Sequence, residues 1–256
     1  MRPGAVPWWA STVTQKNGAG TVSNAVAFEA RWSPRGRGVR RRPPWPTARV
    51  FDFAGRVGLL FAAVRDLDVR CALRASILAK HLRDPDTLVL DELGLEEGSA
   101  RVDIAVVNGS LHGYEIKSDA DTLERLPGQV EVYSRVLDFV TLVVGSRHAR
   151  DALLIIPNWW GVRVAHENDA GELSFRVERR ERMNPGLDLP SVAGLLWRDE
   201  ALAVLEERGR ARGLRSKPRR DLYLALADAL SARELRRVVR ETLRSRTSWR
   251  APAPPA

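Results

Sequence analysis

The sequence has few of the residues and motifs that mark disulfide-bonded, cofactor-binding or membrane-spanning proteins. A single cysteine, Cys71, excludes an internal disulfide and is compatible with the cytoplasmic location that we expect. The four histidines are scattered without a metal-ligand spacing, and no GxxxxGKS/T, GxGxxG, HExxH or CxxC motif occurs. No apolar run approaches the ~18–20 residues that span a bilayer, so we expect no membrane partner.

Charge is distributed unevenly along the 256 residues. Residues 1–50 carry +8 and residues 208–256 carry +10, and because the whole chain carries +9, residues 51–207 carry −9. Basic ends could contact phosphate backbones while an acidic centre holds a cation. Alternatively, the arginines simply accompany arginine-rich coding. We expect the Arg/Pro-rich segment 1–50 to be disordered, with a nucleic-acid-binding arm or a misassigned start as alternatives.

Residues 101–117 read R-V-D-I-A-V-V-N-G-S-L-H-G-Y-E-I-K, with two apolar, β-branched runs around an Asn-Gly turn signal. This pattern predicts a β-hairpin. The first run has Asp103 near its start, and the second has Glu115 and Lys117 near its end. Because the far ends of a hairpin lie side by side, we expect these three side chains to converge.

The loop length of this hairpin decides whether the two acids share a face. A two-residue turn would place Asp103 and Glu115 on opposite faces, since side chains alternate along a strand. A three-residue loop over 108–110 pairs Val107 with Leu111 and Asp103 with Glu115. We predict that loop, or a bulge with the same effect.

Two carboxylates on adjacent strands repel each other unless a positive charge lies between them. Mg²⁺ is commonly held by one or two carboxylates together with substrate phosphate. The lysine two residues further on could bind phosphate or orient a water molecule. The plain alternative is a solvated sheet face with an incidental ion pair among the three side chains.

The order of these residues resembles a known enzyme superfamily. An acid on one strand, Glu-x-Lys on the next, and a helix with Gln129 and Tyr133 four residues apart are similar to the PD-(D/E)XK nucleases, in particular the RecB-like exonuclease branch. The block 65–144 and the C-terminal G-L-R-S-K-P-R-R resemble a bacterial family of unassigned function within that superfamily. One departure is Val102, which stands where the motif has proline.

The resemblance implies roles for individual residues. Mg²⁺ (or Mn²⁺) would be held by the carboxylates of Asp103 and Glu115 and by the backbone carbonyl of Ile116. Lys117 would orient the attacking water or steady the developing negative charge. Glu92 would supply a further acid to the metal, directly or through a water, with a solvated loop glutamate as the alternative.

The helix that begins at Pro127 would carry two more site residues. Gln129 can donate and accept near metal-bound waters or a phosphate, and Tyr133 can donate to phosphate or stack on a base. Because these residues are four apart, they share one helix face. The alternative is a pair of surface polar residues on a packed helix.

Hydrophobic periodicity predicts the remaining elements. We expect a helix over 65–82 with Cys71 as a small core residue, strands over 87–91, 139–144 and 161–165, and helices over 147–154, 197–208, 218–230 and 232–244. The predicted fold class is α/β: a restriction-endonuclease-like mixed sheet core (αβββαβ) over 60–185, flanked by helices, and a small helical module over 190–250.

The start of the 218–230 helix is strongly basic. Lys217, Arg219 and Arg220 are expected to bind nucleic acid, since a helix N-terminus with cations can take a phosphate. The sequence therefore predicts a metal-dependent nuclease acting on nucleic acid, with DNA as the expected partner. The alternative is a non-catalytic nucleic-acid- or partner-binding protein that keeps the fold.

Overall fold

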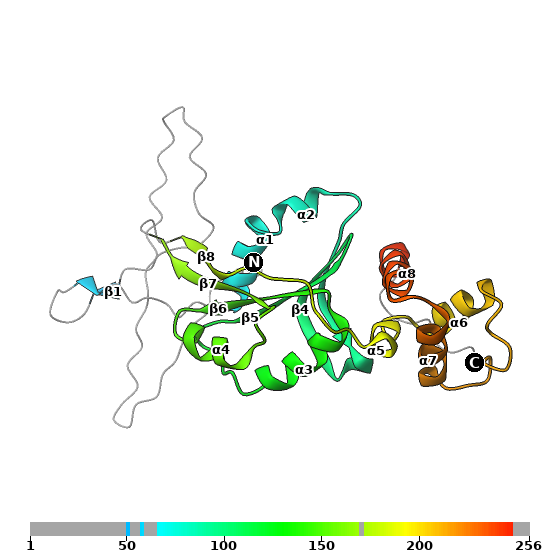
Figure 1. Ribbon diagram of the computed structural model, residues 1–256. Coiled ribbons are helices and arrows are strands. Elements are labelled where there is room, and N and C mark those ends of the chain that lie inside the picture. The colour runs from blue at the N-terminus through cyan, green and yellow to red at the C-terminus, as the bar shows by residue number, and fades with distance from the viewer. Residues whose placement is uncertain (1–49, 52–56, 59–65, 169–171, 248–256) are drawn as a thin grey trace, which may run out of the picture. The chain divides into compact units, whose positions relative to one another are not determined.

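A six-stranded mixed sheet forms the centre of the described chain, with strands in the order β3-β4-β5-β6-β7-β8 (Figure 1). β4 is antiparallel to β3 and β5, β6 is parallel to β5 and β7, and β8 is antiparallel to β7. These six strands span Leu88–Leu95, Ala100–Val107, Leu111–Lys117, Phe139–Gly145, Gly161–Glu167 and Leu173–Arg179.

This computed structural model describes residues 50–51, 57–58, 66–168 and 172–247. The first two of these segments are β1 (Val50–Phe51) and β2 (Val57–Gly58), which form a separate antiparallel pair. The segment 1–50, for which disorder was predicted, lies outside the described residues except for Val50.

Helices cover both faces of the sheet (Figure 1). The described helices are α1 (Asp66–Ala75), α2 (Ala79–Arg83), α3 (Leu126–Val136), α4 (Ala149–Ile155), α5 (Leu189–Ala193), α6 (Arg198–Glu207), α7 (Arg219–Ala229) and α8 (Ala232–Ser245), with a short 3-10 turn at Glu96–Gly98. Of these, α5 to α8 pack together beside the sheet (Figure 1). None of these helices, within the part of the chain that is described, has the length and apolarity to traverse a bilayer. The α/β class with a mixed sheet flanked by helices is confirmed.

The alternation of side chains along the strands divides the core into two clusters. On one face, Val69, Leu73 and Leu78 pack against Ile104 and Ile116 of the hairpin. The other face carries a larger cluster that runs from the sheet through α3 and α4 into all of the C-terminal helices. The C-terminal helices therefore extend the same core as the sheet.

The hairpin of β4 and β5 has the predicted three-residue loop. Val107 pairs with Leu111, and the Asn108 N–H donates to the carbonyl of Ser110 across the loop at 3.0 Å. The paired register ends at Ile104 and Tyr114, and beyond it Asp103 and Glu115 both line one cleft. The two acids of the predicted site are therefore brought to the same place, although they are not a regular cross-strand pair.

Two details of the N-terminal half differ from the sequence prediction. Cys71 is exposed, because α1 ends at Ala75 and buries the face of Val69, Ala72 and Leu73 instead. The first strand of the sheet does not stop at residue 91 but continues to Leu95. The alternation of apolar and polar residues along this strand is hidden in the sequence by two consecutive acids, Asp91 and Glu92. Glu92 lies where the regular pairing with β4 is interrupted.

Two elements were not predicted at all. β8 (Leu173–Arg179) is an edge strand whose residues are partly exposed, so it lacks the apolar run of a buried strand. α5 is only five residues long and begins with Pro190 in its first turn, too short for a helical period to be visible. Ser231 and Glu234 form a capping box at the start of α8, as their Ser-x-x-Glu spacing in the sequence indicates.

Asp138 links the hairpin, β6 and α8. Its buried carboxylate accepts a hydrogen bond from the Leu111 N–H at 2.8 Å. The same carboxylate lies 2.7 Å from Arg236 and 3.7 Å from Arg240, both on α8. Asp138 therefore fixes the last helix against the sheet.

Replacing Asp138 with alanine should destabilise the protein, because two half-buried guanidinium groups lose their shared anion. We expect Asp138→Ala to lower the free energy of unfolding by about 3 kcal/mol, measured by urea denaturation. Asp228→Ala is the matched control, since Asp228 is 82% exposed and 3.6 Å from its partner Arg210. The control should cost less than about 1 kcal/mol, and equal losses in the two variants would contradict this role of Asp138.

Candidate functional site

A cleft of about 910 Å³ lies beside the hairpin ends, between β4, β5 and the start of α3. Six predicted site residues line it: Glu92, Asp103, Glu115, Ile116, Lys117 and Gln129. Tyr133, also predicted, is fully buried next to Glu115. The structure therefore gathers the predicted catalytic and metal-binding residues in one place, whereas Lys217, Arg219 and Arg220 are not among those that line the cleft.

Glu115 is the most enclosed charged side chain of the cleft, with 1% of its surface exposed. Lys117 Nζ lies 2.5 Å from its Oε1, and Gln129 Nε2 donates to the same oxygen at 2.6 Å. The hydroxyl of Tyr133 is 2.7 Å from Oε2. Lys117 is on the same strand face two residues on, and Gln129 and Tyr133 are one turn apart on α3, so each reaches Glu115 for a simple geometric reason.

Tyr133 remains a hydrogen-bond donor because burial, followed by the charge of Glu115, raises its pKa well above the usual range. Its single phenolic hydrogen faces two acceptors, Glu115 Oε2 and the carbonyl of Arg101 at 2.6 Å. The tyrosine therefore spans from α3 to both strands of the hairpin. The role of Tyr133 is to position Glu115, since the tyrosine ring is buried and packs against Trp160.

Asp103 lies where the regular pairing of β4 is interrupted. The ladder with β5 ends at Ile104 and Tyr114, and the Ile116 N–H donates to Asp103 Oδ2 at 2.7 Å instead of to a backbone carbonyl. Because the N–H and C=O of a strand residue point to the same side, the Ile116 carbonyl also points toward Asp103. The geometry is consistent with the predicted use of that carbonyl as a ligand.

The two acids influence each other's ionisation. Burial, followed by the negative charge of Glu115, raises the pKa of Asp103 to about 7, although the Ile116 N–H and Arg70 both act to lower it. A cation bound near two such carboxylates reduces the repulsion between them and favours the ionised form of both. The electrostatics therefore favour a positive charge between Asp103 and Glu115.

Glu92 faces the same cleft, but arginines already surround its carboxylate. Arg70 Nη2 is 3.0 Å from Glu92 Oε1, and Arg101 Nη1 is 3.6 Å from Oε2. Glu92 is also in a left-handed backbone conformation, with φ of 57°. Direct metal binding by Glu92 stays a prediction, and it requires the Arg70 contact to break.

The donor set suits a hard cation with several waters rather than a cage of protein ligands. No group of three His, Cys, Asp or Glu side chains in residues 66–168 and 172–247 is arranged to hold a metal ion. Asp103, Glu115 and the Ile116 carbonyl supply oxygen ligands only, which Mg²⁺ and Mn²⁺ accept. Gln129 Oε1 is buried without a hydrogen-bond partner and can accept from a metal-bound water.

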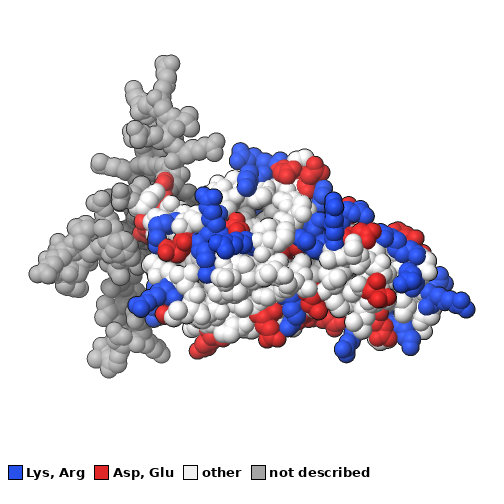
Figure 2. Space-filling model, in the orientation of Figure 1, with Lys and Arg blue, Asp and Glu red and all other residues white. Residues whose placement is uncertain are grey.

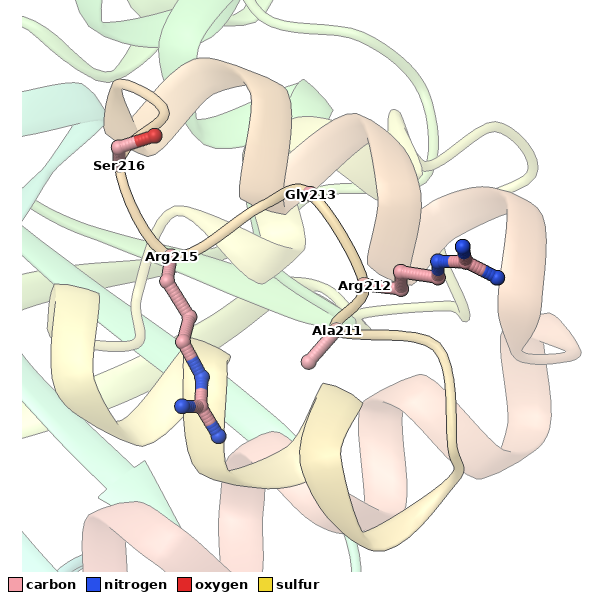
Figure 3. Close-up of a pocket in the computed structure, with 5 residues that line it drawn as sticks. All are labelled: Ala211, Arg212, Gly213, Arg215 and Ser216. Carbon is pink, nitrogen blue, oxygen red and sulfur yellow. The ribbon is translucent and has the colours of Figure 1, made fainter.

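The predicted nucleic-acid-binding residues belong to a basic loop, residues 208–220, which holds seven Lys and Arg and no acid. Part of this loop lines a pocket of about 300 Å³ formed by Ala211, Arg212, Gly213, Arg215 and Ser216. Figure 3 shows the side chains of Arg212 and Arg215 extending away from each other. The loop therefore presents separate cationic contacts rather than one enclosed anion site.

Lys217, Arg219 and Arg220 are exposed, and none of them forms an ion pair with another residue of the described chain. They lie at the start of α7, which begins at Arg219. Figure 2 shows basic and acidic side chains interspersed over the C-terminal helices. Residues 208–220 include no acid, but Arg208, Arg210 and Arg215 pair with acids of the neighbouring helices, which leaves Lys217, Arg219 and Arg220 as cations without an ion pair in the described chain.

Arg70 is the site residue that the sequence did not reveal. It lies on α1, contacts Asp103 and Glu92, and lines the cleft. The only signal in the sequence is its spacing of four from Asp66, which on a helix indicates an ordinary surface ion pair. Nothing in that spacing points to a strand 33 residues away.

The fold and the cleft define an α/β protein with two carboxylates, a lysine and an amide gathered at one end of a mixed sheet. Residues 64–251 match the protein family described as Bacteriophage P4 protein cII, and the chain belongs to that family. Protein cII of Enterobacteria phage P4 is 27% identical over 183 residues, which cover 72% of this chain and 68% of the phage protein.

A solved structure, SPO1766 protein of unknown function from Silicibacter pomeroyi, also resembles part of the chain. It is 18% identical with a TM-score of 0.31, and the match covers 55% of this chain and 92% of that one. A likeness of this size assigns neither a fold nor a function.

The raised pKa of Asp103 predicts a pH dependence of stability in chelator. Because the folded pKa is about 7 and the ordinary value is 3.8, the folded protein retains a proton that the unfolded chain loses as pH rises between those values. This group's contribution to stability is therefore lost as pH rises through about 7. We expect the wild-type unfolding free energy to fall between pH 5 and 8, and Asp103→Asn to reduce that fall.

The measurement is urea denaturation with EDTA at several pH values, together with a carbon-13 NMR titration of the Asp103 carboxyl. Asp199→Asn serves as the control, because Asp199 is 90% exposed and should leave the pH profile unchanged. An Asp103 carboxyl that titrates near its ordinary value would contradict the predicted effect of burial and of Glu115.

Proposed function

We propose that this protein is a Mg²⁺-dependent nuclease of the PD-(D/E)XK superfamily, with a restriction-endonuclease-like core, that hydrolyses phosphodiester bonds of nucleic acid, DNA in the first instance. The observation that carries the proposal is the convergence of Asp103, Glu115 and Lys117 in one cleft at the ends of a hairpin. The order of elements from α1 to β6 is also compatible with the αβββαβ core of that superfamily.

The residues of the cleft have distinct parts in this proposal. Asp103, Glu115 and the Ile116 carbonyl would hold the metal, which when bound polarises the scissile phosphate and lowers the pKa of a water. Lys117, with its Nζ 2.5 Å from Glu115, is placed to orient that water and to steady negative charge on the phosphate. Gln129 and Tyr133 hold Glu115 in position from α3.

The alternative is a non-catalytic protein that binds nucleic acid or a protein partner. The observation that favours it is the internal satisfaction of the cleft, since Glu115 already has three donors and Asp103 already contacts Arg70. A metal titration separates the two functions. The nuclease should bind Mg²⁺ or Mn²⁺ through Asp103 and Glu115, whereas the alternative requires no such binding.

Removal of Lys117 or Asp103 should abolish hydrolysis. We expect Lys117→Ala and Asp103→Asn to lower the rate on linear, circular or single-stranded substrates by at least about 100-fold, because each removes a group that acts on the reacting phosphate or its metal. The assay uses Mn²⁺ or Mg²⁺ with an EDTA control. Lys80→Ala is the matched control, as Lys80 is an exposed lysine on α2 that does not line the cleft.

Unchanged hydrolysis in both variants would exclude the nuclease site proposed here. No hydrolysis by the wild type, combined with metal-independent binding of nucleic acid, would favour the non-catalytic alternative. These two outcomes are distinct because the second is read from a binding assay.

We propose that Lys217, Arg219 and Arg220 contact the phosphate backbone of the nucleic acid. Three observations support this proposal: these residues are exposed, they form no ion pairs within the described chain, and they lie at the start of an 11-residue helix. Contacts of this kind position a strand without reading its sequence. They are suited to a protein that binds nucleic acid through charge.

Each of these cations should appear in the salt dependence of binding. We expect Arg219→Ala or Lys217→Ala to reduce the slope of log affinity against log salt by about 1, because each contact releases roughly one counterion. Fluorescence anisotropy with a labelled duplex and a labelled single strand at 50–300 mM salt, roughly the range over which phosphate contacts respond, measures this slope. Arg219→Lys keeps the charge and should keep the wild-type slope, while an unchanged slope in the alanine variants would place the contact elsewhere.

A further inference from the structure

One guanidinium group, that of Arg70, makes an unusual number of contacts at the edge of the cleft. Its Nη2 donates to Asp103 Oδ1 at 2.9 Å and to Glu92 Oε1 at 3.0 Å. Its Nη1 donates to the Asp103 backbone carbonyl at 2.9 Å, and its Nε donates to Asp66 at 3.2 Å. Only 17% of the Arg70 side chain is exposed, so this is a built-in contact and not a loose surface pair.

The Arg70 contacts fill an interruption in the sheet. The pairing of β3 with β4 runs from Asp91 and Ile104 directly to Leu93 and Val102, so that Glu92 and Asp103 lie opposite each other outside the regular ladder. The left-handed conformation of Glu92 is unfavourable for a residue with a side chain, which implies compensation nearby. Arg70 supplies it by binding the Glu92 carboxylate and the Asp103 carbonyl together.

The cations already present divide the cleft into two sides. Arg70 neutralises the side formed by Glu92 and the Oδ1 oxygen of Asp103. Lys117 is bound to Glu115 on the other side. Asp103 and Glu115 both line the cleft, as does Ile116, whose N–H donates to Asp103 Oδ2 at 2.7 Å.

Nucleases and other phosphoryl-transfer enzymes often use two metal ions about 4 Å apart, with a shared carboxylate between them. A guanidinium is the side chain that best imitates the second ion, since it is always charged and can bind two carboxylates in a fixed plane. In this protein one guanidinium joins Glu92 and Asp103 in that manner.

We propose that Arg70 takes the place of a second metal ion, so that the cleft binds one divalent cation between Asp103 and Glu115 while Glu92 pairs with Arg70 and not with metal. This inference rests on the proposed function, because it specifies the metal content of the same site. It assigns Glu92 the task of holding Arg70, in place of the metal-ligand role expected from the resemblance.

The number of bound metal ions tests this proposal directly. Mn²⁺ binding to the full chain, measured by calorimetry and by electron paramagnetic resonance, should give one site for the wild type and two for Arg70→Gln, because the Glu92 side then becomes available. The double variant Arg70→Gln with Glu92→Gln should return to one site. Arg70→Lys retains a positive charge and should also bind one ion.

Arg74→Gln is the matched control. Arg74 lies one turn along α1 from Arg70 and binds Asp91 at 2.6 Å instead of the cleft acids. Its removal should leave one site with an unchanged Mn²⁺ affinity. Loss or gain of a site in this control would show that any change on α1 alters metal binding, and would overturn the specific role of Arg70.

Glu92→Gln in the wild-type background gives a second measurement that does not depend on the folding of Arg70→Gln. The proposal expects a Mn²⁺ dissociation constant within about 3-fold of the wild type, whereas loss of a direct ligand should weaken binding by at least about 10-fold. Two sites in the wild type, or one unchanged site in a folded Arg70→Gln variant, would overturn the proposal. A folded state is established by circular dichroism.

The nuclease proposal can fail separately. The wild type could bind one Mn²⁺ and gain a second site on loss of Arg70, yet hydrolyse nothing. That outcome would support the role of Arg70 and refute the proposed nuclease activity. A wild type that binds no Mn²⁺ overturns the role of Arg70 as well.

Discussion

The buried carboxylate of Glu115 is the interaction on which the cleft depends. A charge with 1% of its surface exposed is tolerated only when donors replace the lost water. Those donors are Lys117 on the same strand and Gln129 and Tyr133 on α3. The requirement to satisfy one carboxylate therefore fixes the position of α3 over the hairpin, and with it the shape of the cleft.

Asp103 shows how the fold makes backbone and side-chain groups available at a sheet end. Its pairing is interrupted toward both neighbouring strands, and the vacant positions are taken by Arg70 on one side and by the Ile116 N–H on the other. A fully paired strand would bury these groups in the ladder. The interruption leaves the Asp103 carboxylate in the cleft that Glu115 and Ile116 also line, and this arrangement suits cation binding.

The C-terminal helices belong structurally to the sheet that carries the cleft. Their apolar residues join its core, and Asp138 ties α8 to the hairpin through Arg236 and Arg240. The acidic cleft and the basic segment 208–220 are therefore carried by one continuous structure. Acidic side chains outnumber basic ones in the cleft, whereas residues 208–220 hold seven Lys and Arg and no acid, a combination suited to a metal and a polyanion.

The sequence by itself determined the elements whose signals are local. The Asn-Gly turn and the alternation around it fixed the hairpin, the spacing of Gln129 and Tyr133 fixed their shared helix face, and Ser231 with Glu234 fixed the start of α8. Only the tertiary structure decided which face of α1 is buried, that β8 is the edge strand next to β7, and that Arg70 reaches Asp103. The physical reason is range: turn, cap and periodicity signals act over a few residues, whereas burial and ion pairing depend on groups that only the folded chain brings together.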